Sequence, residues 1–489
     1  MPDQDRTLAG NEHDHAAHDR LGPANFWKRI AVTAIAGLLI GFAAYYFVLA
    51  ENWGDMLIKR LQGKELLLGM EITGFWTWLL PALFIAFMMM MIVVVQRKFF
   101  PGTEGTGIPQ AIAAIQVGDR KERCLMLSLR IAIGKTLLLT AALISGITVG
   151  REGPSVHVGA CLMHLCTRVT RLPPFLVQRG LILAGSAAGI AAAFNTPIAG
   201  VIFCFEEVGR MFDKKSVACI IQTVALACGV GVFFLGDYMF YTDANIGARL
   251  PLGFPEEGGF PAFIHDLRQW IAVPIVGIVG GFLGGWFGRG VVTTSRFTGP
   301  RLAKHPWIMG ALLGITLAVI AIASFGVSYG GGYDQAKTML IEASPMAGGA
   351  TTVEWYYPFA KAGASFVSLV SGIPGGLFDP SLAVGASLGQ VTYPLFNNDF
   401  VAPGIGLPEL MMLFMAAYFA GVVQSPITVF AIMFEMTGAY GMILPLMFAA
   451  MIGARVAGRI CEPSIYEALA VQFMKAKGIT LTPDKKSDG

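Results

Sequence analysis

Residues 150–162, GREGPSVHVGACL, decide the fold of this chain because they return 226 residues later as GLFDPSLAVGASL at residues 376–388. Seven of the 13 positions in this pair are identical. A second pair follows at almost the same offset, since residues 187–209 match residues 416–438 at eight of 23 positions. Two matches in the same order at nearly one offset indicate a chain built from two homologous halves.

The repeat separates residues that belong to the scaffold from residues that carry chemistry. Glu206 and Glu435 occupy equivalent places in the two halves, so we predict a shared structural role for both. Glu152 and Glu207 face apolar residues in the other half and have no counterpart there. A symmetric fold therefore carries an asymmetric pair of acids.

The composition places most of the chain in lipid. Of the 489 residues, 55% are hydrophobic and only 14% are charged, against roughly 25% charged in soluble proteins. The mean hydropathy is +0.62. These values exclude a secreted domain, a cytosolic enzyme and a coiled coil. The net charge of +3 implies no nucleic-acid partner, and seven Cys without a CxxC spacing suggest small core residues, with no zinc site or disulfide framework.

The apolar segments predict an all-α polytopic membrane protein. Seven of them are long enough to cross about 30 Å of hydrocarbon; they are 30–50, 73–95, 125–149, 216–235, 270–287, 306–325 and 440–456. Shorter pieces broken by Gly and Pro lie at 106–117, 153–166, 178–194, 197–209, 359–374, 380–396, 409–422 and 426–438. Broken helices are tolerated where they line a polar cavity, and transporters use them at the bilayer midplane. We therefore expect two inverted-topology repeats of tilted and broken helices.

The predicted organisation follows from the repeat and the charges: a polar cytoplasmic tail (1–27), a first membrane repeat (28–235), an extracellular connection (236–264), a second membrane repeat (265–474) and a short cytoplasmic tail (475–489). Lys and Arg gather in the loops predicted to be cytoplasmic, whereas residues 236–268 are acidic. The positive-inside rule then places both termini in the cytoplasm of a cell inner (plasma) membrane. His13, His15 and His18 could bind a metal, but a disordered tail is favoured, and no cofactor is predicted.

Three Gly/Pro elements point to an anion site. GTGIP at 105–109, GREGP at 150–154 and GLFDP at 376–380 each precede an apolar run. Pro suits the first turn of a helix, and Gly lets backbone N–H groups approach a ligand. A helix amino terminus carries unsatisfied donors and a positive partial charge, so several such ends together would bind an anion. The alternative is three ordinary loop-to-helix turns.

The two asymmetric acids suggest proton chemistry. A carboxylate at a helix amino terminus would itself occupy an anion site, so protonation of Glu152 would free the site for a mobile anion. The alternative for Glu152 is a partner for Arg151. Glu207 stands near Arg210 and could form a surface ion pair, but its lack of a counterpart favours proton transfer.

Taken in this order, these residues resemble the CLC chloride channel and transporter family, over about residues 28 to 474. The resemblance rests on GREGP, GLFDP, GTGIP (usually GSGIP in the family), AAFNTPIAGVIFCFEE at 192–207 and the late Tyr466. No single motif is specific, but the combination is. The fluoride-exporting branch of the family departs from GREGP and fits poorly.

The resemblance implies a proton-coupled chloride antiporter that is no enzyme: a homodimer in the lipid bilayer with one anion pathway in each subunit. Glu152 would be the gating and external proton glutamate, and Glu207 the internal proton glutamate. The residues implied in chloride binding are Thr106, Gly107, Gly153, Leu377, Phe378 and Tyr466. Small apolar residues of 216–235 and 440–456 would lie near the dimer interface.

Three residues call for separate expectations. Thr106 stands where chloride-selective members usually have Ser; it keeps the hydroxyl and adds a methyl group. Asp379 could alter the outer mouth electrostatically or act as a solvated helix cap. Lys135 lies in an apolar run, so we expect a structural role with a carboxylate or carbonyl partner.

Two other functions stay open at this point. A passive voltage- or pH-gated chloride channel would use the same pore, although Glu207 argues against it. An intramembrane enzyme would need a nucleophile–base pair or metal ligands at depth. His157 and His164 follow GREGP at a spacing of seven, but no HExxH motif is present.

Overall fold

The computed structural model describes residues 23–66, 72–117, 120–169, 175–209, 214–236, 248–250, 267–344, 353–397, 402 and 404–479. Most of the polar amino-terminal tail with its three histidines, most of the predicted extracellular connection and most of the carboxy-terminal tail lie outside the described residues. Within the described ranges the chain forms helices and no strand longer than a single bridge.

Each of the seven predicted spans falls largely within one of seven helical segments, among the described residues, that are long and apolar enough to cross a membrane. The main helices of these segments are α2 (Pro23–Leu61), α3 (Trp76–Phe99), α6 (Leu129–Ile144), α10 (Lys214–Leu235), α12 (Ala272–Lys304), α13 (Pro306–Ala323) and α19 (Ile443–Gly458). The segment of α6 begins in the preceding short helix at Lys121, and the segment of α19 begins in a 3-10 turn at Tyr440. This prediction is confirmed, and the chain is a multi-pass membrane protein.

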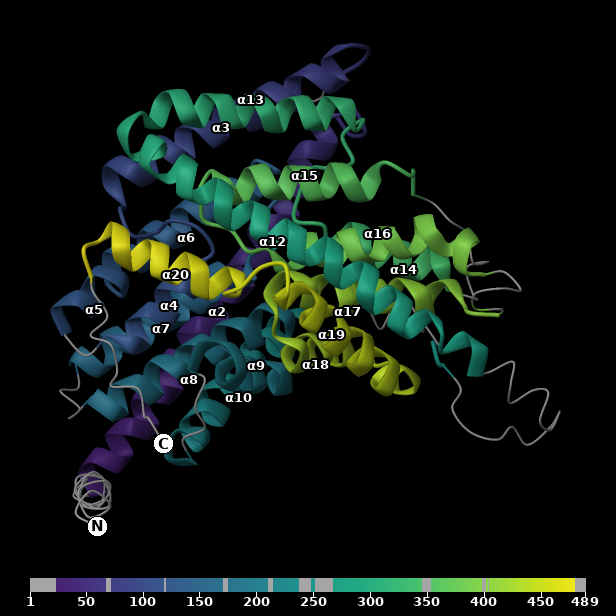
Figure 1. Ribbon diagram of the computed structural model, residues 1–489. Helices are drawn as coiled ribbons and strands as arrows, with labels where there is room; N and C mark the ends of the chain where they lie inside the picture. The colour runs from purple at the N-terminus through teal and green to yellow at the C-terminus, as the bar shows by residue number, and fades with distance from the viewer. Residues whose placement is uncertain are drawn as a thin grey trace.

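The shorter apolar pieces form broken helices: α4 (Ile108–Gln116), α7 (Glu152–Val169), α8 (Phe175–Phe194), α9 (Pro197–Phe203), α15 (Tyr357–Val370), α16 (Phe378–Phe396), α17 (Leu407–Val423) and α18 (Pro426–Thr437). A π-helical turn, η1 (Cys204–Gly209), continues α9. Three further helices are α5 (Arg120–Met126), α14 (Tyr333–Ala343) and α20 (Ile465–Ala476). Figure 1 shows the start of α2, α5 and the end of α20 at one side of the molecule.

Two helices continue well beyond the apolar runs that predict their spans. α12 continues past residue 287 to Lys304. The first apolar run stops before Glu51, but α2 continues for about three more turns to Leu61. The charge does not end the helix because the Arg151 guanidinium, on a distant segment, forms a buried ion pair with the Glu51 carboxylate. An ion at this depth is tolerated when it is paired.

The two halves meet at a pair of equivalent glycines. Gly150 and Gly376 form an antiparallel bridge, with Gly150 N donating to Gly376 O at 2.9 Å and Gly376 N donating to Gly150 O at 2.6 Å. Reciprocal bonds between equivalent residues that run in opposite directions require a local two-fold axis between them. The packing repeats accordingly, since α7 packs on α8 as α16 packs on α17, and α9 meets α18. The inverted repeat is confirmed.

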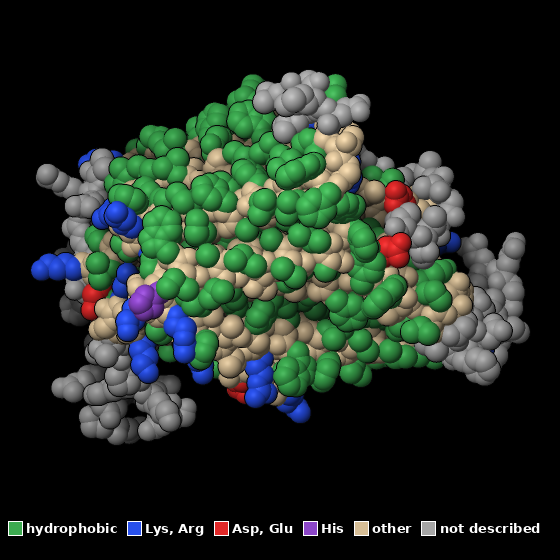
Figure 2. Space-filling view, turned by 90° about the horizontal axis from the view of Figure 1, so that it is seen from above, with side chains coloured by type: hydrophobic (Ala, Val, Ile, Leu, Met, Phe, Trp, Pro, Cys, Tyr) green, Lys and Arg blue, Asp and Glu red, His purple; other side chains and the backbone are tan. Residues whose placement is uncertain are grey.

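The surface matches a lipid environment. Large apolar side chains such as Phe87 on α3 and Trp307 and Ile315 on α13 are more than half exposed, and α3 and α13 pack together at one side of the molecule (Figure 1). Figure 2 shows apolar side chains over the middle of the face and most Lys and Arg toward one end, while Asp and Glu lie at both ends. Lys and Arg gathered at one end are the pattern that the positive-inside rule uses to orient a protein.

The α7–α8 crossing gives a stability prediction. A Cβ added at Gly185 would lie 2.3 Å from Gly159 O, so Gly185→Ala must push the two helices apart. We expect a cost of about 1–3 kcal/mol, measured as a lower thermal unfolding midpoint in detergent. The matched control is Gly299→Ala on α12, where a Cβ meets nothing within 4 Å; it should be neutral or slightly stabilising. Equal midpoints for the two variants would contradict the close crossing.

Candidate functional site

The three Gly/Pro elements come together at the joint between the halves. GREGP and GLFDP are linked by the Gly150–Gly376 bridge. Gly105 N donates to Gly372 O at 2.8 Å, which ties GTGIP to the loop before GLFDP. A Cβ added at Gly153 would lie 2.9 Å from the Cβ of Thr106, so GTGIP and GREGP touch as well. Three helix amino termini thus converge.

Buried polar side chains hold GTGIP in place. Lys135 is fully buried on α6, and its Nζ donates to the carbonyl oxygens of Thr103 and Gly105. Gln110 Nε2 donates to Glu104 O at 2.6 Å, and Gln96 Nε2 to Gly372 O at 2.9 Å. The predicted carbonyl partners of Lys135 are confirmed, and its charge is directed at the loop backbone.

The converging helix starts offer donors without caps. No side chain caps the amino terminus of α4 at Gly107 or that of α16 at Leu377. Gly107 has φ +98°, and a Cβ there would lie 2.4 Å from the Cβ of His157, so only glycine fits. The buried hydroxyl of Thr106 has no hydrogen-bond partner among the described residues. Orphan donors at helix starts suit an anion.

An aromatic cluster surrounds the start of α16. The ring centroid of Phe378 lies 4.7 Å from that of Phe419, 5.8 Å from Phe194 and 6.4 Å from both Phe203 and Tyr466. Sequence reasoning assigned Phe378 a backbone donor and missed its ring. Aromatic residues near the repeat motifs were the only available sign of such a cluster. Because they are scattered along the chain, the sequence alone does not show that they meet. The cluster fixes Tyr466 of α20 against the site.

Glu152 occupies the joint itself. It lies in the first turn of α7 and is fully buried. A Cβ added at Gly150 or Gly376 would lie 2.3 Å from its Oε2, so the carboxyl group fills the space that the two glycines leave. The alternative partnership with Arg151 is contradicted, because the Arg151 guanidinium forms its ion pair with Glu51. The carboxyl group receives no hydrogen bond from a described donor side chain.

Glu207 is a buried acid in the π-helical turn that follows α9. It belongs to η1 and is 3% exposed, so it is no surface residue; Arg210 lies outside the described residues. The Ser425 hydroxyl, just before α18, donates to its Oε2. The phenol of Tyr466 lies within electrostatic range of both Glu207 and Glu152. Tyr466 is thus electrostatically coupled to both asymmetric acids.

Glu206 and Glu435 form a symmetric pair of caps. The Glu206 carboxylate accepts hydrogen bonds from the first backbone N–H groups of α18, at Ile427 N (3.1 Å) and Thr428 N (2.6 Å). Glu435 accepts from the corresponding groups of α9, at Ile198 N (3.0 Å) and Ala199 N (2.7 Å). The shared structural role predicted for both residues is confirmed.

The two histidines after GREGP have local partners. His157 Nε2 lies 2.9 Å from the carbonyl oxygen of Met126, and His164 Nε2 lies 3.7 Å from Cys124 Sγ. In the described part of the chain, no group of three or more His, Cys, Asp or Glu side chains could hold a metal ion.

Comparison with known proteins identifies relatives of this architecture. The model of the family described as "voltage gated chloride channel" matches residues 87–458. The H(+)/Cl(-) exchange transporter 5 of Oryctolagus cuniculus is 28% identical over 86% of this chain; the match covers 54% of that relative, about half of its length. The H(+)/Cl(-) exchange transporter ClcA of Salmonella agona is 27% identical over 86% of this chain and 83% of its own.

Solved structures share the fold. A slow cyanobacterial Cl-/H+ antiporter superposes with a TM-score of 0.74 at 22% identity, covering 92% of this chain and 99% of its own. A CLC-type fluoride/proton antiporter gives a TM-score of 0.68 at 19% identity, covering 91% of this chain and 98% of its own.

The symmetric caps give the second prediction. Glu206→Ala and Glu435→Ala each leave two backbone N–H groups of a helix start without their acceptor, so each should cost about 1–2 kcal/mol. The measurement is the thermal unfolding midpoint of the purified protein. Glu65→Ala serves as control because Glu65 forms only an exposed ion pair with Arg60. A large loss in one cap variant and none in the other would refute the symmetric role.

Proposed function

The chain belongs to the voltage-gated chloride channel family, and we propose that it exchanges chloride for protons across the membrane. One observation carries the proposal: uncapped helix starts and the unpartnered hydroxyl of Thr106 meet beside the buried carboxyl group of Glu152. The names of the relatives, which are H(+)/Cl(-) exchange transporters, support the same activity.

The anion is held by partial charges. Backbone N–H groups at the starts of α4, α7 and α16 supply donors and the positive ends of the helix dipoles. The proposed chloride-binding residues are Thr106, Gly107, Gly153, Leu377, Phe378 and Tyr466. The hydroxyl groups of Thr106 and Tyr466 add side-chain donors. Because no full positive charge is used, the anion can leave as readily as it enters.

Glu152 couples the anion to the proton. As a carboxylate, it competes with chloride for the helix starts. When it takes up a proton it loses its charge and its attraction to those donors, so it can move aside and admit an anion. One side chain therefore alternates between closing the anion path and carrying a proton.

Glu207 is the proposed internal proton glutamate. Its burial and its bond from Ser425 keep it apart from bulk solvent, and the phenol of Tyr466 lies within electrostatic range of both Glu207 and Glu152. A buried acid without a structural counterpart in the other half is better explained by proton transfer than by folding.

We further propose that the protein is a homodimer in the cell inner (plasma) membrane with both termini in the cytoplasm. Exposed apolar residues of α10 and α19, among them Ile221, Phe233 and Phe448, would lie near the subunit interface. The Lys and Arg side chains gathered toward one end in Figure 2 support the orientation.

The third prediction tests the two acids in liposomes that carry a chloride gradient, with external pH recorded. The unmodified protein should drive protons uphill. Glu207→Ala should still move chloride but lose proton movement, because the internal proton carrier is gone. Glu152→Gln, which mimics the protonated side chain, should also lose coupling and pass chloride at every pH.

The neighbouring acid supplies the control. Glu206→Gln should keep coupled exchange, since Glu206 only caps α18. Chloride flux without proton movement in the unmodified protein would refute the antiporter hypothesis and favour the passive channel. Proton coupling that survives Glu207→Ala would remove Glu207 from the path.

The fourth prediction concerns Thr106. Thr106→Val keeps the shape and removes the hydroxyl, so we expect chloride affinity to fall by about 1.5–3 kcal/mol, tenfold or more. Thr106→Ser keeps the donor and should bind chloride nearly as well as the unmodified protein. Calorimetric titration with chloride measures both. Equal affinity in the Val variant would show that the hydroxyl does not contact the anion.

A further inference from the structure

A run of carboxyl groups leads away from Glu152 toward one end of the molecule. In order, it contains Glu152, Asp379, Glu51, Asp55 and Asp334. The last four have no part in the anion site described above. They come from α16, α2 and α14, three helices that the sequence gives no reason to connect.

Asp379 is the first step. It lies in the first turn of α16 and is 1% exposed, so the expected solvated cap is wrong. Neither of its carboxyl oxygens receives a hydrogen bond from a described donor. Its carboxyl group lies within hydrogen-bonding reach of that of Glu152. Two carboxyl groups can bond to each other only if a proton lies between them.

Glu51 of α2 is the second step. A Cβ added at Gly331 would lie 2.8 Å from Glu51 Oε1 and 3.8 Å from the Cβ of Asp379, so both acids flank the same glycine. Electrostatic coupling also links the Glu51 carboxyl group to that of Asp379. The Arg151 guanidinium contacts the other oxygen of Glu51 and holds the side chain in place.

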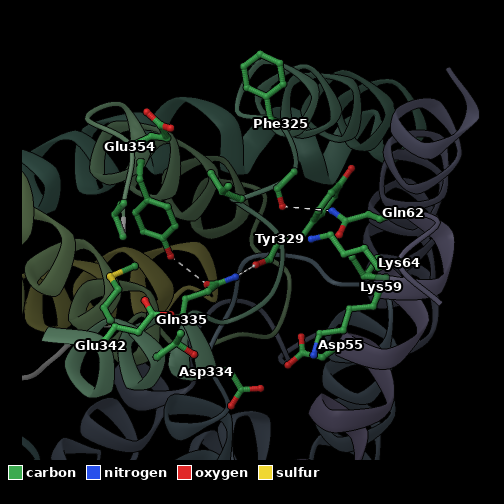
Figure 3. A pocket seen from close by; sticks show the side chains of 17 residues that line it. Asp55, Lys59, Gln62, Lys64, Phe325, Tyr329, Asp334, Gln335, Glu342 and Glu354 are labelled. Atoms are coloured by element: carbon green, nitrogen blue, oxygen red, sulfur yellow. Dashed lines mark hydrogen bonds between the residues drawn. The ribbon is translucent and has the colours of Figure 1, made fainter. Parts of the chain in front are cut away.

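Asp55 and Asp334 complete the run. Asp55 follows Glu51 by one helical turn, a spacing that puts both side chains on one face of α2. It lies beside Gly330 and within hydrogen-bonding reach of Asp334. Figure 3 shows these two aspartates together on the wall of a cavity of about 480 Å³ between α2 and α14. Exposure rises along the run, from the fully buried Glu152 to the exposed Asp334.

The cations that face the run are too few to neutralise it. Arg151 pairs with Glu51, and Lys361 of α15 lies within electrostatic range of Asp55, Glu51 and Asp379. Lys361 is fully buried and also donates to the carbonyl oxygens of Tyr329 (3.0 Å) and Gly330 (2.9 Å).

At the rim, Lys59 faces Asp55, and Lys64, Glu342 and Glu354 line the cavity. At the inner end the phenol of Tyr466 faces Glu152. Four carboxyl groups, from Glu152 to Asp55, therefore meet two buried cations. Unpaired buried charge is costly, which disfavours four carboxylates beside only two buried cations.

We propose that Asp379, Glu51, Asp55 and Asp334 form a proton relay between Glu152 and the cavity, which the charge pattern places on the outer side. The inference rests on the proposed function, because it supplies the protons that Glu152 exchanges. A hydronium ion of the outer solution gives its proton to Asp334 and becomes water, and the proton passes through Asp55 and Glu51 to Asp379. The Asp379 O–H then donates to the Glu152 carboxylate and leaves Asp379 ionised until the next proton arrives. The reverse sequence releases a proton outside.

Because Glu152 is buried, it needs a proton donor close to it, and the relay supplies one. A proton donor must come within hydrogen-bonding distance of its acceptor, directly or through one water. Glu152 is fully buried in this conformation. Asp379 is the acid that meets this condition, and it connects Glu152 to groups that reach solvent.

The fifth prediction uses Asp379→Asn and Asp55→Asn, which keep shape and remove the exchangeable proton. Each should slow coupled exchange in liposomes by about a hundredfold and flatten its dependence on external pH. Chloride affinity, measured by calorimetry, should change less than twofold because the helix starts remain. Glu65→Gln, an exposed acid beyond the same end of α2, is the matched control and should behave as the unmodified protein.

Infrared difference spectra between acidic and alkaline buffers give a readout that needs no transport. The C=O band of the protonated carboxyl group in the Asp379–Glu152 pair should disappear in Asp379→Asn and in Glu152→Gln. It should persist in Glu65→Gln. Coupled exchange with an unchanged rate and pH profile in both Asn variants would overturn the relay while the antiporter stands. If the unmodified protein moved chloride without protons, the antiporter hypothesis would be refuted, and the relay would be refuted with it as a transport path. The infrared band alone would then show whether Asp379 and Glu152 share a proton.

Discussion

The two reciprocal hydrogen bonds between Gly150 and Gly376 are the joint on which the rest of the structure depends. Irregular backbone at membrane depth must satisfy its polar groups inside the protein. Here the backbone N–H and C=O groups of each half bond to those of the other half. Two interruptions of helical structure that would each be costly alone are therefore stable together. The bridge also fixes α7 and α16 so that their amino termini start at one place. A side chain on either glycine would displace the carboxyl group of Glu152, which explains why both positions are glycine.

The anion site that we propose at the joint relies on partial charges because the nearby full charges are already used. The ammonium group of Lys135 is directed at the carbonyl oxygens of Thr103 and Gly105. The guanidinium group of Arg151 is paired with Glu51. Both cations therefore stabilise the scaffold of the site, and what remains for a ligand is the partial charge of the helix starts. We expect such a site to bind weakly enough to release the anion, which a transport cycle requires.

The sequence predicted the spans, the repeat and the shared role of Glu206 and Glu435 because each of these depends on a local pattern. It could not predict that α2 continues past Glu51, since the partner that neutralises the acid lies 100 residues away in the chain. The same limit applies to Asp379. A polar residue in the first turn of a helix is typical of a cap, and only the packing of α2 and the glycines at 330–332 shows that it is buried.

The repeat also explains how the acids come to lie together. Glu152 has Phe378 as its counterpart, and Asp379 has Gly153, so each half carries one acid and the two are offset by one position. At a two-fold joint, residues at the same position would face each other across the axis, and two like charges there would repel. The offset leaves Phe378 free to fill the aromatic cluster while Asp379 reaches the carboxyl group of Glu152. A shift of one residue thus turns a symmetric scaffold into a site where one proton is shared by two halves.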